Sequence, residues 1–178
     1  MKKKIGEIFT ITREVSAGTG YSYYLALLTE GLALIDSGTS EQGNHLAGGN
    51  VLQTFTFICL KEGEASFQLA KFRVFDPADI LYENVSTVKI ENVSYAGDNS
   101  RGGWTEYHEL SPEERKIFEE AFEGLIGVKY TPVMVKSQIV NGVNYIYIAD
   151  AVGAYLDAIS FKTQVSIYKP TQGKAVIT

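Results

Sequence analysis

Cysteine and histidine are almost absent from this sequence of 178 residues. The single cysteine, Cys59, excludes a disulfide within the chain, and it leaves the redox compartment open because proteins without disulfides fold in any compartment. The two histidines, His45 and His108, lie in different halves, so there is no metal-ligand spacing and no cysteine–histidine pair for nucleophilic catalysis. We therefore expect a protein that is not an enzyme and that needs no metal or other cofactor.

Long apolar runs and clusters of positive charge are absent too. The formal net charge is −5, and the basic residues are spread over both halves, so a nucleic-acid partner is not expected. No stretch is long enough to span a membrane, and the basic start 1–4 lacks the apolar run of a signal peptide. The sequence predicts a soluble monomer, either cytoplasmic or extracellular or periplasmic after signal removal.

The first half has the pattern of an all-β domain. Alternating apolar residues are separated by glycine-rich breaks at 16–20, 36–43, 46–50 and 61–64, which is typical of an antiparallel sandwich. Cys59 shares its face of a strand with Val51, Phe55 and Phe57, so we expect a buried thiol. The predicted strands are 7–13, 21–28, 32–35, 51–60, 65–72 and 85–91.

Three loops of this half carry a family resemblance. Their sequences are Ala-Gly-Thr-Gly-Tyr-Ser-Tyr at 17–23, Leu-Ala-Gly-Gly-Asn at 46–50 and Lys-Phe-Arg-Val-Phe at 71–75. In this order they resemble the three binding loops of the chagasin-type inhibitors, although Val74 and Phe75 replace the Pro and Trp of the family's Arg-Pro-Trp. The resemblance implies an immunoglobulin-like sandwich whose loops plug the active site of papain-like proteases. The binding residues that it implies are Gly18, Thr19, Gly20, Gly48, Gly49, Arg73 and Phe75.

The middle of the chain has the composition of a connector between domains. Residues 92–103 are small, polar and rich in glycine, a composition typical of flexible linkers and domain boundaries. We therefore predict two domains, 1–93 and 102–178, joined by a linker at 94–101.

The second half begins with a strong helix signal. Ser111 suits the N-cap, Pro112 the first helical position, and Glu114 the capping box. Gly127 is the expected end of the helix. The outer side, Glu119, Glu120 and Glu123, is expected to be solvated. The apolar face consists of Ile117, Phe118, Ala121, Phe122 and Leu125.

Only strands follow this helix. Alternation and turn residues predict strands at 130–136, 143–149, 158–168 and 174–178. One helix packed on a four-strand antiparallel sheet is an α+β fold. In the third strand one face could pack on the helix, namely Ile159, Phe161, Thr163, Val165 and Ile167.

The loop at 137–145 joins the first two of these strands. It contains Asn141-Gly142, which tight hairpins prefer because both residues tolerate positive φ. A plain hairpin tip is the simplest interpretation. Gln138, Val140 and Gly142 nevertheless spell Gln-x-Val-x-Gly, which resembles the central loop of the cystatins, inhibitors of papain-like cysteine proteases.

Two further segments extend this resemblance over 101–178. A double glycine precedes the helix, where cystatins carry an N-terminal glycine, and 169–173 is similar to the Leu-Pro loop of the stefin type. Trp104 matches no family position and either belongs to the core or flanks the site. The resemblance implies a cystatin-like fold. Its binding residues would be Gly102, Gly103, Gln138, Ile139, Val140, Asn141, Gly142 and Pro170.

The principal prediction is an inhibitor of papain-like cysteine proteases of the cathepsin type that blocks the active-site cleft with a tripartite loop wedge, with either one or both halves binding a protease. One alternative is a protein-binding module without inhibitory activity, because these folds host many functions. The other is a dimeric aspartic protease, because 36–38 is spelled Asp-Ser-Gly. That chemistry needs two carboxylates that share a proton, and the chain has one such motif. The simplest interpretation of Asp36 is a turn at the end of a strand.

Overall fold

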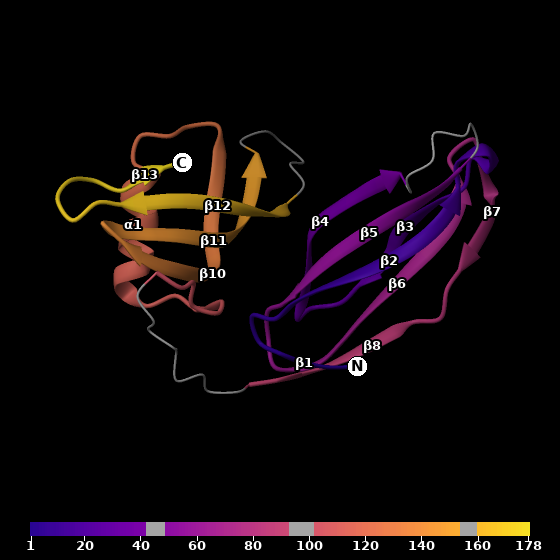
Figure 1. Ribbon diagram of the computed structural model, residues 1–178, viewed down its shortest axis with the longest axis horizontal. Helices are drawn as coiled ribbons and strands as arrows, with labels where there is room; N and C mark the ends of the chain where they lie inside the picture. Colours follow the sequence, from indigo (N-terminus) through magenta and orange to yellow (C-terminus); the bar gives the residue numbers. More distant parts are fainter. Residues whose placement is uncertain (42–48, 93–101, 154–159) are drawn as a thin grey trace. The chain divides into compact units, whose positions relative to one another are not determined.

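The computed structural model describes residues 1–41, 49–92, 102–153 and 160–178 (Figure 1). The chain forms two compact units, Met1–Val93 (unit 1) and Ser94–Thr178 (unit 2). The predicted domain bounds and linker stay predictions, because 93–101 lies outside the described residues. Among those residues no helix is both long and apolar enough to cross a membrane.

Unit 1 is a sandwich of two sheets, which confirms the all-β class predicted for the first half. The smaller sheet has the order β2-β5-β4, and the larger runs β1-β8-β6-β3 with β7 paired to β6. The strands are β1 (Lys2–Lys4), β2 (Ile8–Ser16), β3 (Ser22–Leu28), β4 (Leu32–Glu41), β5 (Asn50–Cys59), β6 (Gly63–Arg73), β7 (Asp76–Tyr82) and β8 (Ser86–Glu91), and a 3-10 turn, η1 (Ala17–Thr19), follows β2.

The core of unit 1 lies between these two sheets. The Phe57 ring of β5 stacks on the Phe67 ring of β6 with 4.8 Å between centroids, and Phe9 of β2 lies 5.4 Å from Phe57. Both Phe57 and Cys59 are fully buried, which confirms the prediction of a buried thiol. Apolar side chains of alternate strand positions thus meet across the sandwich.

Several predicted boundaries in unit 1 were wrong. Strand β4 continues to Glu41, so Asp36 lies within a strand opposite Thr56 and not in a turn. Residues 36–41 are small or polar, so the sequence did not predict this extension, which depends on pairing with β5 rather than on local propensity. Strands β1 and β7 were not predicted, because three lysines and a proline-containing segment are poor local strand signals.

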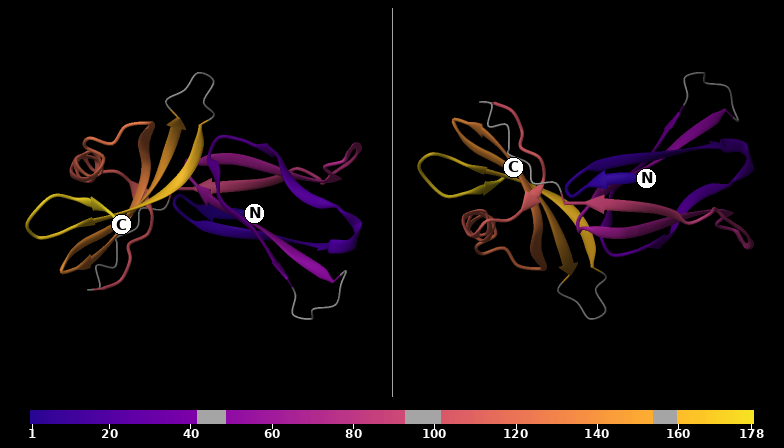
Figure 2. Two further views of the ribbon diagram at one scale, coloured as in Figure 1. Left: turned by 90° about the horizontal axis from the view of Figure 1, so that it is seen from above. Right: turned by 90° about the horizontal axis from the view of Figure 1, so that it is seen from below.

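Unit 2 is one antiparallel sheet with α1 (Pro112–Ala121) on one face (Figure 2). The sheet order is β13-β12-β11-β10-β9, so the described residues form five strands where four were predicted. The α+β class is as expected. The core holds Phe118 of the helix against Tyr147 and Ile167 of the sheet. The strands are β9 (His108–Glu109), β10 (Val128–Val140), β11 (Gly142–Gly153), β12 (Phe161–Lys169) and β13 (Val176–Ile177).

The start of α1 was predicted correctly and its end was not. Ser111 and Glu114 form the predicted capping box, and Pro112 occupies the first turn. The helix ends at Ala121, because Gly124 adopts φ +86° and the chain leaves the helix before Gly127. Leu125, predicted for the apolar face of the helix, lies beyond its end and is 57% exposed. Phe161 on β12, predicted to pack on the helix, is 56% exposed. Residues 158 and 159 lie outside the described residues.

The burial of Cys59 gives a chemical test of the sandwich. Burial raises the pKa of this thiol to about 11, so the reactive thiolate is scarce at neutral pH. We expect the native chain to react with Ellman's reagent at least about a hundredfold more slowly than an exposed thiol, and one equivalent to react in guanidinium. The Ser37→Cys variant adds an exposed thiol on β4 as a positive control. Rapid reaction of the native wild-type chain would contradict the core described above.

Candidate functional site

The tip of the β10–β11 hairpin lies where the sequence predicted a hairpin. Val140 pairs with Gly142, so Asn141 alone turns the chain. Residues 137–140 belong to β10 and not to a loop. Ile139 and Val140 have 56% and 44% of their surface exposed, and alternation places them on opposite faces. The hairpin therefore presents apolar surface on both sides of its tip.

Gly142 allows this tip to approach the next strand closely. Its φ is +113°, and a Cβ at this position would lie 2.5 Å from the carbonyl oxygen of Lys169. The hydroxyl of Tyr168 donates a hydrogen bond to the carbonyl of Asn141. Antiparallel pairing of β11 with β12 places the hairpin tip and the loop after β12 at the same end of the sheet (Figure 1). The missing side chain of Gly142 lets the two come into close contact there.

The segment that contains the double glycine runs beside β10. The side-chain amide of Gln138 donates a hydrogen bond of 2.9 Å to the carbonyl of Gly102. Trp104 forms an antiparallel bridge with Gln138, and the amide of Thr105 donates to the carbonyl of Ser137 at 2.8 Å. Gly103 lies exposed between these contacts. Two segments more than thirty residues apart are thus joined next to the hairpin tip.

The loop after β12 is held by the helix. Glu120 of α1 accepts hydrogen bonds from the ammonium of Lys169 at 2.7 Å and from the amide of Ala175 at 3.0 Å. Lys169 also donates to the carbonyl of Gly173, which closes the loop that contains Pro170. The hydrogen bond from Lys169 lowers the pKa of Glu120. Glu120 was predicted to be merely solvated, and it instead fixes the second loop.

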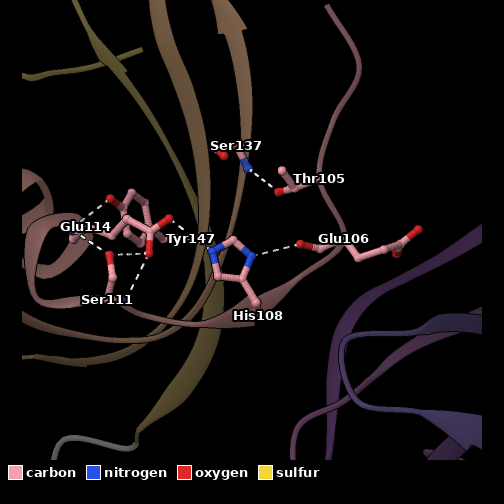
Figure 3. A network of polar contacts seen from close by, with 7 residues as sticks. All are labelled: Thr105, Glu106, His108, Ser111, Glu114, Ser137 and Tyr147. Carbon is pink, nitrogen blue, oxygen red and sulfur yellow. Dashed lines mark hydrogen bonds and ion pairs between the residues drawn. The ribbon is translucent and has the colours of Figure 1, made fainter. Parts of the chain in front are cut away.

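A polar network anchors the segment that follows the double glycine (Figure 3). The two ring nitrogens of His108 lie 3.0 Å from the carbonyl of Glu106 and 3.0 Å from the carboxylate of Glu114. Ser111 donates to the same carboxylate through its amide and its hydroxyl. The backbone carbonyl of Glu114 accepts from the Tyr147 hydroxyl, so the network reaches the core strand β11.

In unit 1 the predicted loops gather at one end of the sandwich. Strand β2 ends at Ser16, which pairs with Asn50, so η1 follows β2 at the end of the sheet where Gly49 precedes β5. Gly48 lies outside the described residues. Gly18 and Thr19 are exposed in η1. The turn between β6 and β7 reaches the same end (Figure 1).

The first and third loops of unit 1 touch. A Cβ at Gly20, which has φ +71°, would lie 3.0 Å from the ring of Phe75. Arg73 lies 4.7 Å from the ring centroid of Tyr21 and 5.7 Å from that of Phe75. Asp79 accepts hydrogen bonds from the Tyr21 hydroxyl and from Arg73, and these contacts lower its pKa. Phe75 remains 76% exposed.

The first half of the chain also matches a known family. Residues 2–90, half of the 178 residues, match the family model described as Chagasin family peptidase inhibitor I42. The chain belongs to the chagasin family. This match confirms the chagasin resemblance of the first half. Members of this family are protease inhibitors rather than enzymes. The match ends at residue 90, so the cystatin resemblance of 102–178 stays a prediction.

Two solved structures resemble part of this chagasin-family chain. The cysteine protease inhibitor EhICP2 from Entamoeba histolytica is 13% identical, with a TM-score of 0.41, and the match covers 52% of this chain and 86% of that one. Amebosin is 19% identical, also with a TM-score of 0.41, and the match covers 51% of this chain and 87% of that one. No curated protein sequence matches the chain.

Sequence reasoning missed the residues that support the loops. Glu120 and Asp79 each bind a cationic residue next to a loop, Lys169 and Arg73 respectively. Asp79 faces Arg73 across a turn, which is a weak sequence signal, and Glu120 lies 49 residues from Lys169, so no local pattern indicates that pair. Within 1–41, 49–92, 102–153 and 160–178, no group of three or more His, Cys, Asp or Glu is placed to hold a metal.

Gly142 and Gly173 give a matched pair for testing the close approach at the hairpin tip. Both have φ +113°, but a Cβ at Gly173 would meet nothing closer than 3.5 Å. Replacement by Ala adds backbone strain of about 1–3 kcal/mol at each position. We expect Gly142→Ala to lower the free energy of unfolding further, because its Cβ clashes with a backbone oxygen. Chemical denaturation of the two variants measures the difference, and equal losses would contradict the contact.

The capping network predicts a pH dependence for unit 2. Burial alone would raise the pKa of Glu114, but hydrogen bonds from Ser111 and His108 hold it below 4.5. Since the folded pKa is depressed, the stabilisation is present above about pH 4.5 and is lost as pH falls through the lower folded value.

We therefore expect Glu114→Gln to reduce the free energy of unfolding by about 1–2 kcal/mol at pH 7 and by less near pH 3. Glu113→Gln, in the same helical turn, is the control for charge alone. Thermal unfolding at the two pH values measures both variants, and equal effects of the two would contradict the network.

Proposed function

We propose that this chain inhibits papain-like cysteine proteases of the cathepsin type, and that each unit fills an active-site cleft with glycine-bearing loops. Unit 1 would act with its η1 turn, the start of β5 and the turn at 73–76. Unit 2 would act with a wedge of three segments, 102–104, 138–142 and 169–173. The family assignment supports inhibition by unit 1. The hydrogen bond from Gln138 to Gly102 carries the proposal for unit 2, because it joins two of the segments.

A wedge of this kind suits the chemistry of these enzymes. A papain-like protease cleaves a chain that it holds extended with a carbonyl between its thiolate and its oxyanion hole. An inhibitor that fills the cleft on both sides of that point without presenting a carbonyl there is bound and not cut. Glycine permits close backbone approach to the enzyme, and hairpin tips that are already shaped lose little conformational entropy on docking.

In unit 2 the proposal rests on the arrangement of the tip. Apolar Ile139 and Val140 are exposed between two loops that are themselves held in place. The order of one helix followed by antiparallel strands, with the Gln138–Gly142 motif in the first hairpin, supports a cystatin-like assignment. Contacts by apolar groups and backbone tolerate sequence differences between enzymes, so we expect several papain-like proteases to be inhibited.

In unit 1 the exposed tip is aromatic and flanked by a cation. Phe75 projects at the end of the sandwich, with Gly20 beneath its ring and Arg73 beside it. This provides a flat apolar surface together with a guanidinium group, two features that are enriched at the centres of protein interfaces.

Titration of papain tests the proposal. The wild-type chain should block two equivalents of papain, measured with a fluorogenic peptide. A charge on an exposed apolar tip residue should remove one equivalent without unfolding the unit, so Phe75→Asp and Val140→Asp should each block one equivalent and the double variant none. Ile126→Asp is the control, because Ile126 is 96% exposed and lies before the start of β10, away from the tip.

The outcomes separate the parts of the proposal. A wild-type chain that leaves papain fully active at micromolar concentration is a binding module without inhibitory activity, and the proposed function fails. If the wild-type chain blocks one equivalent of papain, and this inhibition is lost in Phe75→Asp and kept in Val140→Asp, unit 1 is the inhibitor and the second head is refuted.

A further inference from the structure

Trp104 is the only tryptophan of the chain, and 41% of its surface is exposed. It lies next to the double glycine and forms a bridge with Gln138, so its main chain belongs to the wedge of unit 2. Neither the family match nor the resemblance of the second half assigns it a role. An exposed indole at this place needs an explanation, since large aromatic side chains contribute most when they are desolvated.

The side chain of Trp104 makes a cation–π contact with Lys136. The ammonium of Lys136 lies 5.2 Å from the indole centroid and 5.0 Å from the ring centroid of Tyr107. Both rings contact the same ammonium, but Tyr107 is only 5% exposed, whereas 41% of the surface of Trp104 is exposed. The cation–π contact therefore fixes the indole while leaving a large part of its surface free.

The indole lies on the sheet face that points away from the helix. Val135 belongs to the core under α1, so by alternation Lys136, Gln138 and Val140 lie on the opposite face of β10. Trp104 lies on the same face, because its ring contacts the ammonium of Lys136 and its backbone is paired with Gln138. Two residues along a strand cover about 7 Å, so the backbone at Gln138, to which Trp104 is bridged, is about 7 Å from the tip residue Val140. A protein that covers the tip on this face reaches the indole.

We propose that Trp104 is a further contact and specificity residue of unit 2, and that its indole packs against an apolar side chain on the wall of the protease cleft. The proposal rests on the proposed function of unit 2. The immobilised indole adds apolar contact at little entropic cost, since Lys136 already restricts its rotation. The neighbouring ammonium disfavours a protease whose wall carries a Lys or Arg at that place.

The test uses the full chain with Phe75→Asp, so that only unit 2 can inhibit papain. In this background we expect Trp104→Ala to raise the inhibition constant about 10- to 100-fold, in the range of interface hot spots. Trp104→Phe, which keeps an aromatic ring, should change it by less than about fivefold. Ile126→Ala is the matched control for loss of an exposed apolar side chain, and it should have no effect.

A spectroscopic measurement separates contact from structural support. The single tryptophan is replaced biosynthetically by 5-fluorotryptophan, and the chain is mixed with papain whose active-site cysteine is alkylated. If Trp104 contacts papain, we expect the fluorine chemical shift to change on binding. We also expect the difference between its chemical shifts in H2O and in D2O to disappear, because the indole is then shielded from solvent. Thermal unfolding of Trp104→Ala and Trp104→Phe reports on the fold.

Failure of this inference differs from failure of the proposed function. If Val140→Asp abolishes inhibition in the Phe75→Asp background while Trp104→Ala and the fluorine resonance show no effect, Trp104 is not a contact and the wedge stands. If the Phe75→Asp chain does not inhibit papain, the second head is refuted and the Trp104 contact with it. If Trp104→Ala weakens inhibition only by unfolding the chain, with an unchanged fluorine resonance, the role is structural and the inference is overturned.

Discussion

The lack of a side chain at Gly142 is the constraint on which the exposed edge of unit 2 depends. The backbone turns there with φ +113°, and the carbonyl of Lys169 occupies the space that a Cβ would need. Strand pairing of Val143 with Lys169 then aligns the tip of one hairpin with the start of the next loop. A side chain at this position would clash with that carbonyl unless one of the two segments moved. Glycine at position 142 is therefore a condition for the close contact of the two segments.

Unit 1 reaches a comparable result by other contacts. Gly20 leaves space for the ring of Phe75, and cations lie between aromatic rings on the same face: Lys71 lies 5.3 Å from the centroid of Tyr21, and Arg73 lies on that ring and on Phe75. Each unit thus has, near its exposed apolar tip, a glycine at a close contact and a cation beside an aromatic ring. Shape is thus fixed before any partner binds.

Local signals predicted the parts of the fold that local chemistry determines. The capping box of Ser111 and Glu114 was predicted correctly because its bonds span three residues. The end of α1, the length of β4 and strand β7 were missed because they depend on a glycine dihedral or on a partner strand. The loop residues of both units were predicted from the spelling of their motifs. The hydrogen bond from Gln138 to Gly102 links positions 36 residues apart, and no local pattern predicts it. Glu120 could not be found for the same reason, because Lys169 lies 49 residues away.

The replacement of proline by Val74 shows why these supports matter. In the Arg-Pro-Trp spelling that the third loop resembles, the proline ring restricts the backbone by itself, and Val74 lacks that ring. Here Asp79 binds Arg73 at 3.2 Å and accepts from Tyr21, so the strand β7 beyond the turn holds the residue before Val74. An ionic contact across the turn thus restrains this loop, in which Val74 does not fix its own φ as a proline ring would. Such a contact weakens with salt and with protonation of the carboxylate, whereas a ring does not, so the order of this loop depends on solution conditions in a way that a proline-containing loop does not.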